Sequence, residues 1–298
     1  MPKAEGGTPV DPYSDPMSAD PGTLYVVATP IGNLEDITLR ALRTLREVDL
    51  VAAEHVPVAR ALLRHFKIDT TVVAYHDHGP EAEQILRRML DGESVALTSD
   101  AGTPGMSDPG HALVDATRRA GLRVVPIPGV TASAALWSAA GIAGADFRYY
   151  GFLPRKPSAV RSALVELAEQ GRPAIVYEAP RRLQATLAAI AQIIPDADLT
   201  IGRELTKLHE QIWTGRPEEA LNEFIDPRGE FTILLIPPPP DTESWSDAQI
   251  AEALSEAAAQ GASRSQAARH VSQLSGRLRR EIYALWPFPE HARHSQTE

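Results

Sequence analysis

The chain has 298 residues, a formal net charge of −10 and no cysteine. This length predicts two domains with a substantial buried core. The lack of cysteine excludes disulfides, thiolate metal sites and cysteine nucleophiles, and it predicts a reducing, cytoplasmic location.

Residues 1–22 are polar and rich in Pro and Gly, which predicts a disordered tail and no signal peptide. From 23 to 142, apolar runs alternate with helical patterns, as in a mostly parallel sheet covered by helices. The expected strands span 23–29, 49–54, 71–76, 94–100 and 123–128. The expected helices span 39–48, 58–66, 81–90, 111–120 and 131–140. We therefore expect a first α/β domain over 23–142.

A second α/β domain is expected over 143–236. Its strands are predicted at 147–153, 173–178, 198–204, 210–214 and 230–236, and its helices at 158–169, 181–194 and 217–224. Residues 237–245 form a Pro-rich linker, and 246–298 a helical extension with segments at 247–260, 263–274 and 277–286. Ser263 and Gln266 have the spacing of a capping box. Apolar runs stay far below the roughly 20 residues of a spanning helix, so we expect no membrane partner.

Three expected strands end in loops rich in turn-forming residues, at 28–33, 99–110 and 126–132. In open α/β sheets, ligands bind outside the carboxyl ends of the strands, so the loops predict one cleft. None of them matches a dinucleotide fingerprint or a P-loop. Pro104 and Pro109 remove backbone donors, and Asp100 and Asp108 repel anions, which favours a neutral or cationic ligand. We expect Asp108 to cap the next helix rather than to catalyse.

Several expected strands end in acid or base groups. These are Glu54, His76, Asp100, Glu178, Glu204 and Glu230. His76 and His78 share one face of a strand, but no third ligand is evident, so we expect no metal site. The chain has no Gly-x-Ser-x-Gly elbow, which leaves hydrolase chemistry without support.

Basic residues gather in two segments of this acidic chain. Residues 148–182 contain seven basic and three acidic residues, and 264–280 contain five arginines and no acid. Solvated helix faces are the plain explanation for such clusters. A basic footprint for nucleic-acid phosphates on an acidic body is the alternative.

Five motifs together resemble the ribosomal RNA small subunit methyltransferase I family of the tetrapyrrole methylase superfamily. They are LYVVATPIGNLEDIT (24–38), TSDAGTPGMSDPG (98–110), GFLPRK (151–156), YEAPRRL (177–183) and RELTKLHE (203–210). The resemblance implies the class III methyltransferase fold, with two α/β domains of mixed sheets flanked by helices. It further implies a homodimer, S-adenosylmethionine in the cleft between the domains, and methylation of a ribose 2′-hydroxyl of a cytidine in the decoding region of 16S rRNA. The expected partner is therefore the small ribosomal subunit and not DNA.

The resemblance also implies site residues. Cofactor contacts are expected from Pro30, Gly32, Asp100, Ala101, Gly102, Thr103, Pro128, Gly129, Thr131 and Ala132, and from Tyr177, Glu178, Arg203, Glu204, Gly229 and Glu230 in the second domain. RNA contacts are expected from Arg155, Lys156, Arg181 and Arg182. A base would take the hydroxyl proton, with Glu54 first among the candidates and Asp100 and His76 after it.

One segment departs from the family pattern. Where the family usually has Glu-Asp-Thr-Arg, this chain has Glu54, His55, Val56 and Pro57. We expect cofactor binding to survive this change and RNA positioning or rate to be altered. Two other functions stay open: a methyltransferase of the same fold acting on a tetrapyrrole or protein, and a catalytically decayed ribosome-binding paralogue.

Overall fold

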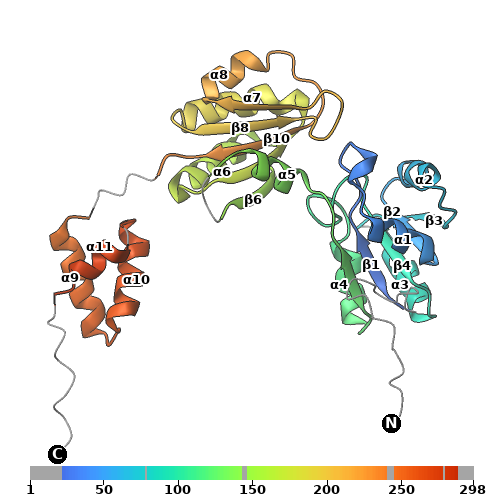
Figure 1. Cartoon of the computed structure of the whole chain (residues 1–298), viewed down its shortest axis with the longest axis horizontal. Coiled ribbons are helices and arrows are strands. Elements are labelled where there is room, and N and C mark those ends of the chain that lie inside the picture. Colours follow the sequence, from blue (N-terminus) through green and yellow to red (C-terminus); the bar gives the residue numbers. More distant parts are fainter. Residues whose placement is uncertain (1–21, 78, 143–145, 240–244, 278, 288–298) are drawn as a thin grey trace, which may run out of the picture.

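The computed structural model describes residues 22–77, 79–142, 146–239, 245–277 and 279–287. It contains two α/β parts and a group of C-terminal helices (Figure 1). Several expected features lie outside the described residues: residues 1–21 of the N-terminal tail, His78, the boundary at residue 143, most of the Pro-rich linker and the last residues of the extension.

The first sheet is fully parallel and has the order β3-β2-β4-β1-β5. Its strands are β1 (Leu24–Val27), β2 (Leu50–Ala53), β3 (Val72–Ala74), β4 (Val95–Thr98) and β5 (Val124–Ile127). Its helices are α1 (Leu39–Glu47), α2 (Val56–His65), α3 (Glu81–Leu90) and α4 (His111–Arg119), with a 3₁₀ turn η1 at Leu34–Asp36. Because all five strands run the same way, the three turn-rich loops emerge at one edge.

Both faces of this sheet are buried, as parallel sheets require. Tyr25 and Val27 pack against Leu45 of α1, whereas Leu24 on the opposite face packs against Met89 of α3. The helix expected to begin at residue 58 begins at Val56, because Pro57 occupies the first turn, where its missing N–H is not needed.

The second sheet is mixed, with the order β6-β7-β10-β8-β9. Its strands are β6 (Arg148–Phe152), β7 (Ala174–Glu178), β8 (Asp198–Arg203), β9 (Gln211–Gly215) and β10 (Phe231–Ile236). Only β6 and β7 pair in parallel. Helices α6 (Pro157–Gln170), α7 (Pro180–Ile193) and α8 (Pro217–Glu223) pack on one face, around Leu164, Leu187 and Phe224.

The other face of the second sheet is covered by α5 (Ala132–Ala139), which directly follows the first sheet. Leu136 of α5 is fully buried and packs with Ile175 and Leu234. Helix α5 therefore joins the two parts, and its first turn reaches the space between the sheets.

The C-terminal helices are α9 (Asp247–Ala259), α10 (Arg264–Ser275) and α11 (Arg279–Ala284), which bury Ile250, Val271 and Ile282. The expected capping box of Ser263 and Gln266 is confirmed at the start of α10. The α/β fold with mixed sheets and C-terminal helices is likewise confirmed. Within the described ranges, no helix has the length and apolar character needed to cross a membrane.

Candidate active site

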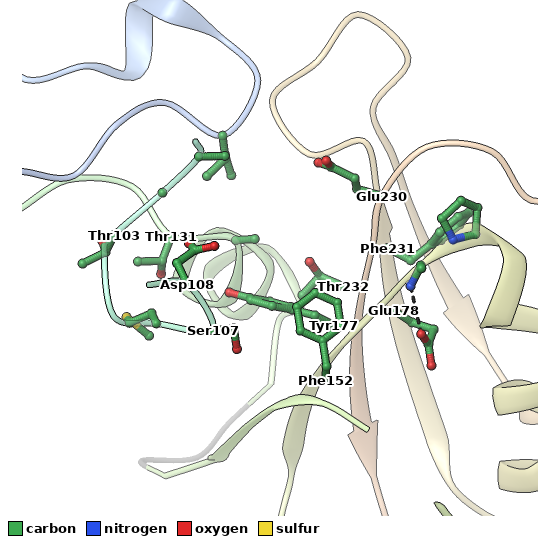
Figure 2. Close-up of a pocket in the computed structure, with 17 residues that line it drawn as sticks. Thr103, Ser107, Asp108, Thr131, Phe152, Tyr177, Glu178, Glu230, Phe231 and Thr232 are labelled. Carbon is green, nitrogen blue, oxygen red and sulfur yellow. Dashed lines mark hydrogen bonds between the residues drawn. The ribbon is translucent and has the colours of Figure 1, made fainter. Parts of the chain in front are cut away.

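A cavity of about 290 Å³ lies between the two sheets. Figure 2 shows Thr103, Ser107, Asp108 and Thr131 on one side of it and Tyr177, Glu230, Phe231 and Thr232 on the other. One wall is thus the loop after β4 together with the start of α5, and the other comes from the ends of β7 and β10. The lining is mostly apolar, and a few hydroxyls and carboxylates reach it.

The loop after β4 is held by the loop after β1. Thr29 and Gly102 exchange backbone hydrogen bonds of 2.8 and 3.0 Å, and Thr29 Oγ1 donates to Ser99 O at 3.2 Å. Gly102 has a φ of +80°, a conformation that favours glycine. The two loops therefore form one continuous wall.

Two tyrosines of the second sheet contact the opposite wall. Tyr149 Oη and Ser107 Oγ share a hydrogen bond of 2.6 Å, and Tyr177 Oη accepts from the backbone N–H of Ser133 at 3.2 Å. Burial raises the pKa of Tyr149 to about 12, so this phenol stays neutral. These bonds fix the separation of the two walls.

A second cavity, of about 520 Å³, shares Ile31, Ala101 and Glu230 with the first. Lys207 lies on its border and pairs with Glu204 at 3.0 Å and with Glu230 at 2.9 Å. Burial alone would raise the pKa of Glu204, but the bond from Lys207 and that from the Glu230 amide lower it on balance. A single ion-pair network therefore borders both cavities.

The loop after β1 approaches this network closely. A Cβ on Gly32 would lie 2.3 Å from Lys207 Cγ, and Asn33 N donates to Thr206 Oγ1 at 3.1 Å. Only glycine leaves room for this contact between the two halves.

Three exposed or half-exposed groups meet where β2 and β4 end. Glu54, His55 and Asp100 have ligand atoms within 4.8 Å of one another, and His55 Nδ1 lies 2.7 Å from Asp100 Oδ2. Exposed groups of this kind are common without an ion. That the protein needs no metal stays a prediction.

The expectation that Asp108 caps α4 is wrong. The N-cap is Gly110, and no side chain at the cap position bonds to the helix. Asp77, which follows β3, instead accepts from Gly110 N at 3.0 Å and from Ala112 N at 3.4 Å, and Tyr75 Oη accepts from Leu113 N at 3.1 Å. Since Tyr75 and Asp77, which follow β3, satisfy these amides, Asp108 is not used by the helix and lines the cavity.

The pKa values of Asp77 and Asp108 are shifted in opposite directions by their environments. Burial would raise the pKa of Asp77, but bonds from Tyr75 and the two α4 amides, with the charge of His111, lower it on balance. The pKa of Asp108 is raised to about 6, first by burial and then by the charges of Glu54 and Asp100, against a hydrogen bond from Ser99.

The structure gathers eleven of the predicted site residues around the two cavities. The first is lined by Ala101, Gly102, Thr103, Thr131, Ala132, Tyr177, Glu178 and Glu230, and the second by Pro30, Gly32 and Asp100, with Ala101 and Glu230 in common. The carboxylate of Glu178 is buried and accepts from Ala179 N at 2.9 Å and from Thr186 Oγ1 at 2.6 Å, so its bonds are to its own domain.

Other predicted residues line neither cavity. Among them Gly129 packs against Ala28, Arg203 donates to Arg228 O at 2.9 Å, and His76 lies exposed with its Nδ1 3.8 Å from Glu81 Oε1. The rest of this set is Pro128, Glu54, Glu204 and Gly229. Gly229 has a φ of +88° and leaves space for the side chain of Glu204.

Sequence reasoning missed several lining residues. They are Ile31, Met106, Ser107, Asp108, Phe152, Ala179, Pro180, Phe231 and Thr232. Most of them lie within the quoted motifs, close in sequence to residues that were predicted, and this proximity is the sequence feature that would have indicated them.

A third cavity, of about 790 Å³, touches the first through Phe152 and Ala179. Arg155, Arg181 and Arg182 line it. Arg182 donates to Leu153 O at 3.0 Å and to Pro154 O at 2.9 Å, and its Nε lies 3.3 Å from the buried Glu178 carboxylate. Arg182 is thus engaged inside the fold, whereas Arg155, Arg181 and the nearby Lys156 are exposed.

Solved structures share this architecture. Uroporphyrin-III-C-methyltransferase from Thermus thermophilus superposes with a TM-score of 0.53 at 21% identity, covering 72% of this chain and 94% of its own. A diphthine synthase gives a TM-score of 0.57 at 15% identity, covering 72% of this chain and 89% of its own. At these identities the likeness concerns the fold alone.

Sequence relatives are closer. The family Tetrapyrrole (Corrin/Porphyrin) Methylases matches residues 23–221. Ribosomal RNA small subunit methyltransferase I of Synechocystis is 43% identical over 89% of this chain and 97% of its own. The protein of the same name from Halalkalibacterium halodurans is 38% identical over 90% of this chain and 95% of its own. The chain therefore belongs to the tetrapyrrole methylases, whose methyl donor is S-adenosylmethionine, and within them to the ribosomal RNA small subunit methyltransferase I family.

Proposed function

We propose that the protein transfers a methyl group from S-adenosylmethionine to the ribose 2′-hydroxyl of a cytidine in the decoding region of 16S rRNA. The observation that carries the proposal is the cavity between the sheets, which adjoins a third cavity bordered by arginines. The names of the sequence relatives support small-subunit rRNA as the substrate.

The first cavity fits the cofactor chemically. S-adenosylmethionine supplies an electrophilic methyl group on a sulfonium cation and carries an adenosine and an amino acid. Apolar walls such as Ile31 and Phe231 suit the adenine, and the hydroxyls of Thr103 and Thr131 offer hydrogen bonds. Asp108 and Glu230 place negative charge near the cavity, which favours a cationic ligand.

The third cavity suits an RNA strand beside the cofactor. Phe152 is 52% exposed and belongs to both the first and third cavities, so its ring offers a base a stacking surface. Arg155 and Arg181 border the same space and offer charge to phosphates, and Lys156 extends this patch. We do not assign Arg182 to RNA, because its donors are engaged by the fold.

The chemical step is an in-line displacement, which requires the acceptor oxygen, the methyl carbon and the sulfur to be aligned. Holding two reactants in this geometry contributes on the order of 7–11 kcal/mol to lowering the barrier. We propose that Glu54 and Asp100 border the acceptor side, because they meet where β2 and β4 end. His76 is oriented toward Glu81 and is the weakest of the three predicted bases.

The homodimer and the cytoplasmic location stay predictions. Light scattering during size-exclusion chromatography tests the first, because a dimer has twice the mass of the 32.3 kDa chain.

The function is tested by methyl transfer from labelled S-adenosylmethionine to small ribosomal subunits and to naked 16S rRNA. Digestion and nucleoside analysis of the product should give 2′-O-methylcytidine. Label in a protein or in a tetrapyrrole would support the alternative acceptors, and cofactor binding without any transfer would support a decayed ribosome-binding paralogue. No cofactor binding by calorimetry would refute a methyltransferase of any specificity.

A further inference from the structure

Asp108 is a carboxylate in the cavity for which the described residues provide no ion pair. It lies in the turn between β4 and α4, is half-buried, and is labelled in Figure 2 among the residues that line the cavity. No lysine, arginine or histidine of the described ranges pairs with it, although fifteen other acidic side chains have such a partner.

Asp108 also has no role in capping α4, the structural function that its position in the chain suggests. Asp108 lies two positions before Gly110, the N-cap of α4, and an acidic side chain near a helix N-terminus is commonly stabilised by the free amides of the first turn. In this fold Asp77 and Tyr75 accept from the amides of Gly110, Ala112 and Leu113. Asp108 is therefore not needed to complete α4.

The groups around Asp108 come from four elements. Glu54 follows β2, Ser99 and Asp100 follow β4, and Tyr149 belongs to β6. Each of these residues interacts electrostatically or by a hydrogen bond with Asp108. Tyr177 of β7 lines the same cavity, and His55 bonds to Asp100 at 2.7 Å. The two neighbouring carboxylates and the partial burial all favour the protonated form of Asp108.

We propose that Asp108 is the general base of the reaction, an inference that rests on a hydroxyl being the methyl acceptor as set out above. As the acceptor oxygen bonds to the methyl carbon, its O–H bond breaks and the proton passes to a carboxylate oxygen of Asp108. The C–S bond breaks at the same time, and its electron pair stays on sulfur as a neutral thioether. The products are the methyl ether, S-adenosylhomocysteine and neutral Asp108, so charge and atoms balance.

The environment of Asp108 suits this role. A base is most effective when its pKa lies near the working pH, because it is then mostly ionised and still holds the proton it receives. The pKa of Asp108 is raised to about 6, so at neutral pH it is ionised and more basic than an ordinary carboxylate. Glu54 and Asp100 act on it through their charge and are positioning residues in this step.

The test compares wild type with Asp108→Asn and with Asp115→Asn, an exposed aspartate of α4 whose partner is Arg119. Single-turnover transfer at saturating cofactor should fall by about 10²–10⁴-fold in Asp108→Asn. Cofactor affinity by calorimetry should weaken only modestly in Asp108→Asn, which removes one negative charge from the cavity. Asp115→Asn should bind the cofactor and react as wild type does. Circular dichroism confirms that each variant is folded.

The pH dependence gives a signature that a structural role would not produce. For wild type, log kcat/KM should rise with unit slope and level off above about pH 6, and Asp108→Asn should lose this inflection. Glu54→Gln should move the inflection to lower pH, because it removes a charge that holds the proton on Asp108. Asp108→Glu should recover part of the rate.

An Asp108→Asn variant that reacts as fast as wild type, that keeps the inflection, or that fails to bind the cofactor would overturn the assignment. Wild-type protein that methylates no RNA hydroxyl would instead refute the proposed function, and this is seen before any variant is compared.

Discussion

Replacing Asp108 by Asn should stabilise the folded protein at neutral pH while abolishing fast methyl transfer. The folded-state pKa of Asp108 lies above the 3.8 of an ordinary aspartate, so folding is favoured by the protonated form. The contribution of Asp108 to the free energy of unfolding is therefore largest below about pH 4. It falls as the pH rises toward 6, because the unfolded chain releases its proton at a lower pH than the folded protein does.

The magnitude follows from the shift. A rise in pKa from 3.8 to about 6, at 1.36 kcal/mol per pKa unit, means that ionised Asp108 lowers the free energy of unfolding by at most about 3 kcal/mol. Because the carboxylate is only half-buried, solvent screening reduces this figure, and we expect a gain of about 1–2 kcal/mol for the neutral amide at pH 7.5. At pH 4 the gain should disappear, since the carboxyl is then protonated in the folded state.

Matched urea titrations at pH 4 and pH 7.5, followed by far-ultraviolet circular dichroism, measure the difference between variant and wild type. Asp115→Asn is the control, because its exposed carboxylate pairs with Arg119 within α4. A gain of equal size at both pH values would show that Asn packs better than Asp for reasons unrelated to charge. A lower free energy of unfolding for Asp108→Asn at pH 7.5 would refute the conclusion that burial and the neighbouring carboxylates destabilise ionised Asp108.

Gly151→Ala places a side chain at a φ of +74° and its Cβ 2.5 Å from Ser107 Oγ, so we expect a loss of about 1–2 kcal/mol in stability and weaker cofactor binding by calorimetry. Unchanged binding would contradict the close approach of the two walls. Arg181→Ala should weaken RNA binding and reduce the slope of log binding constant against log salt concentration by about 1. Arg182→Ala should chiefly lower the unfolding temperature, because its donors are bonded within the fold. The reverse pattern would contradict the assignment of these arginines. Asp77→Ala should lower the free energy of unfolding by about 1–3 kcal/mol, because the amides of α4 lose their acceptor. Since the pKa of Asp77 is lowered from 3.8, that loss should shrink as the pH falls below about 4 in urea titrations, and a loss that does not vary with pH would exclude the ionised carboxylate as its source.

Much of the fold could be predicted from local patterns. The alternation of short apolar runs with helical periodicity places β1 to β5 and their helices, because each face of a parallel sheet must be covered. The capping box of Ser263 and Gln266 is equally local, since both partners lie within one helical turn. The loops that end β1 and β4 indicated a cleft because carboxyl ends of parallel strands share one edge.

Other features depend on residues far apart in the chain. Whether Asp108 caps a helix or enters a cavity is decided by Asp77 and Tyr75, which reach α4 from the end of another strand. Whether Arg182 is available to RNA is decided by the carbonyl groups that follow β6.

Sequence by itself determined which segments become strands and helices and which family's motifs they carry, because propensity, periodicity and capping act over a few residues. The tertiary structure decided which polar side chains are used up by the fold and which remain for chemistry. The physical reason is that a buried or half-buried polar group must find a partner, and the identity of that partner depends on strand order and packing rather than on neighbours in the sequence.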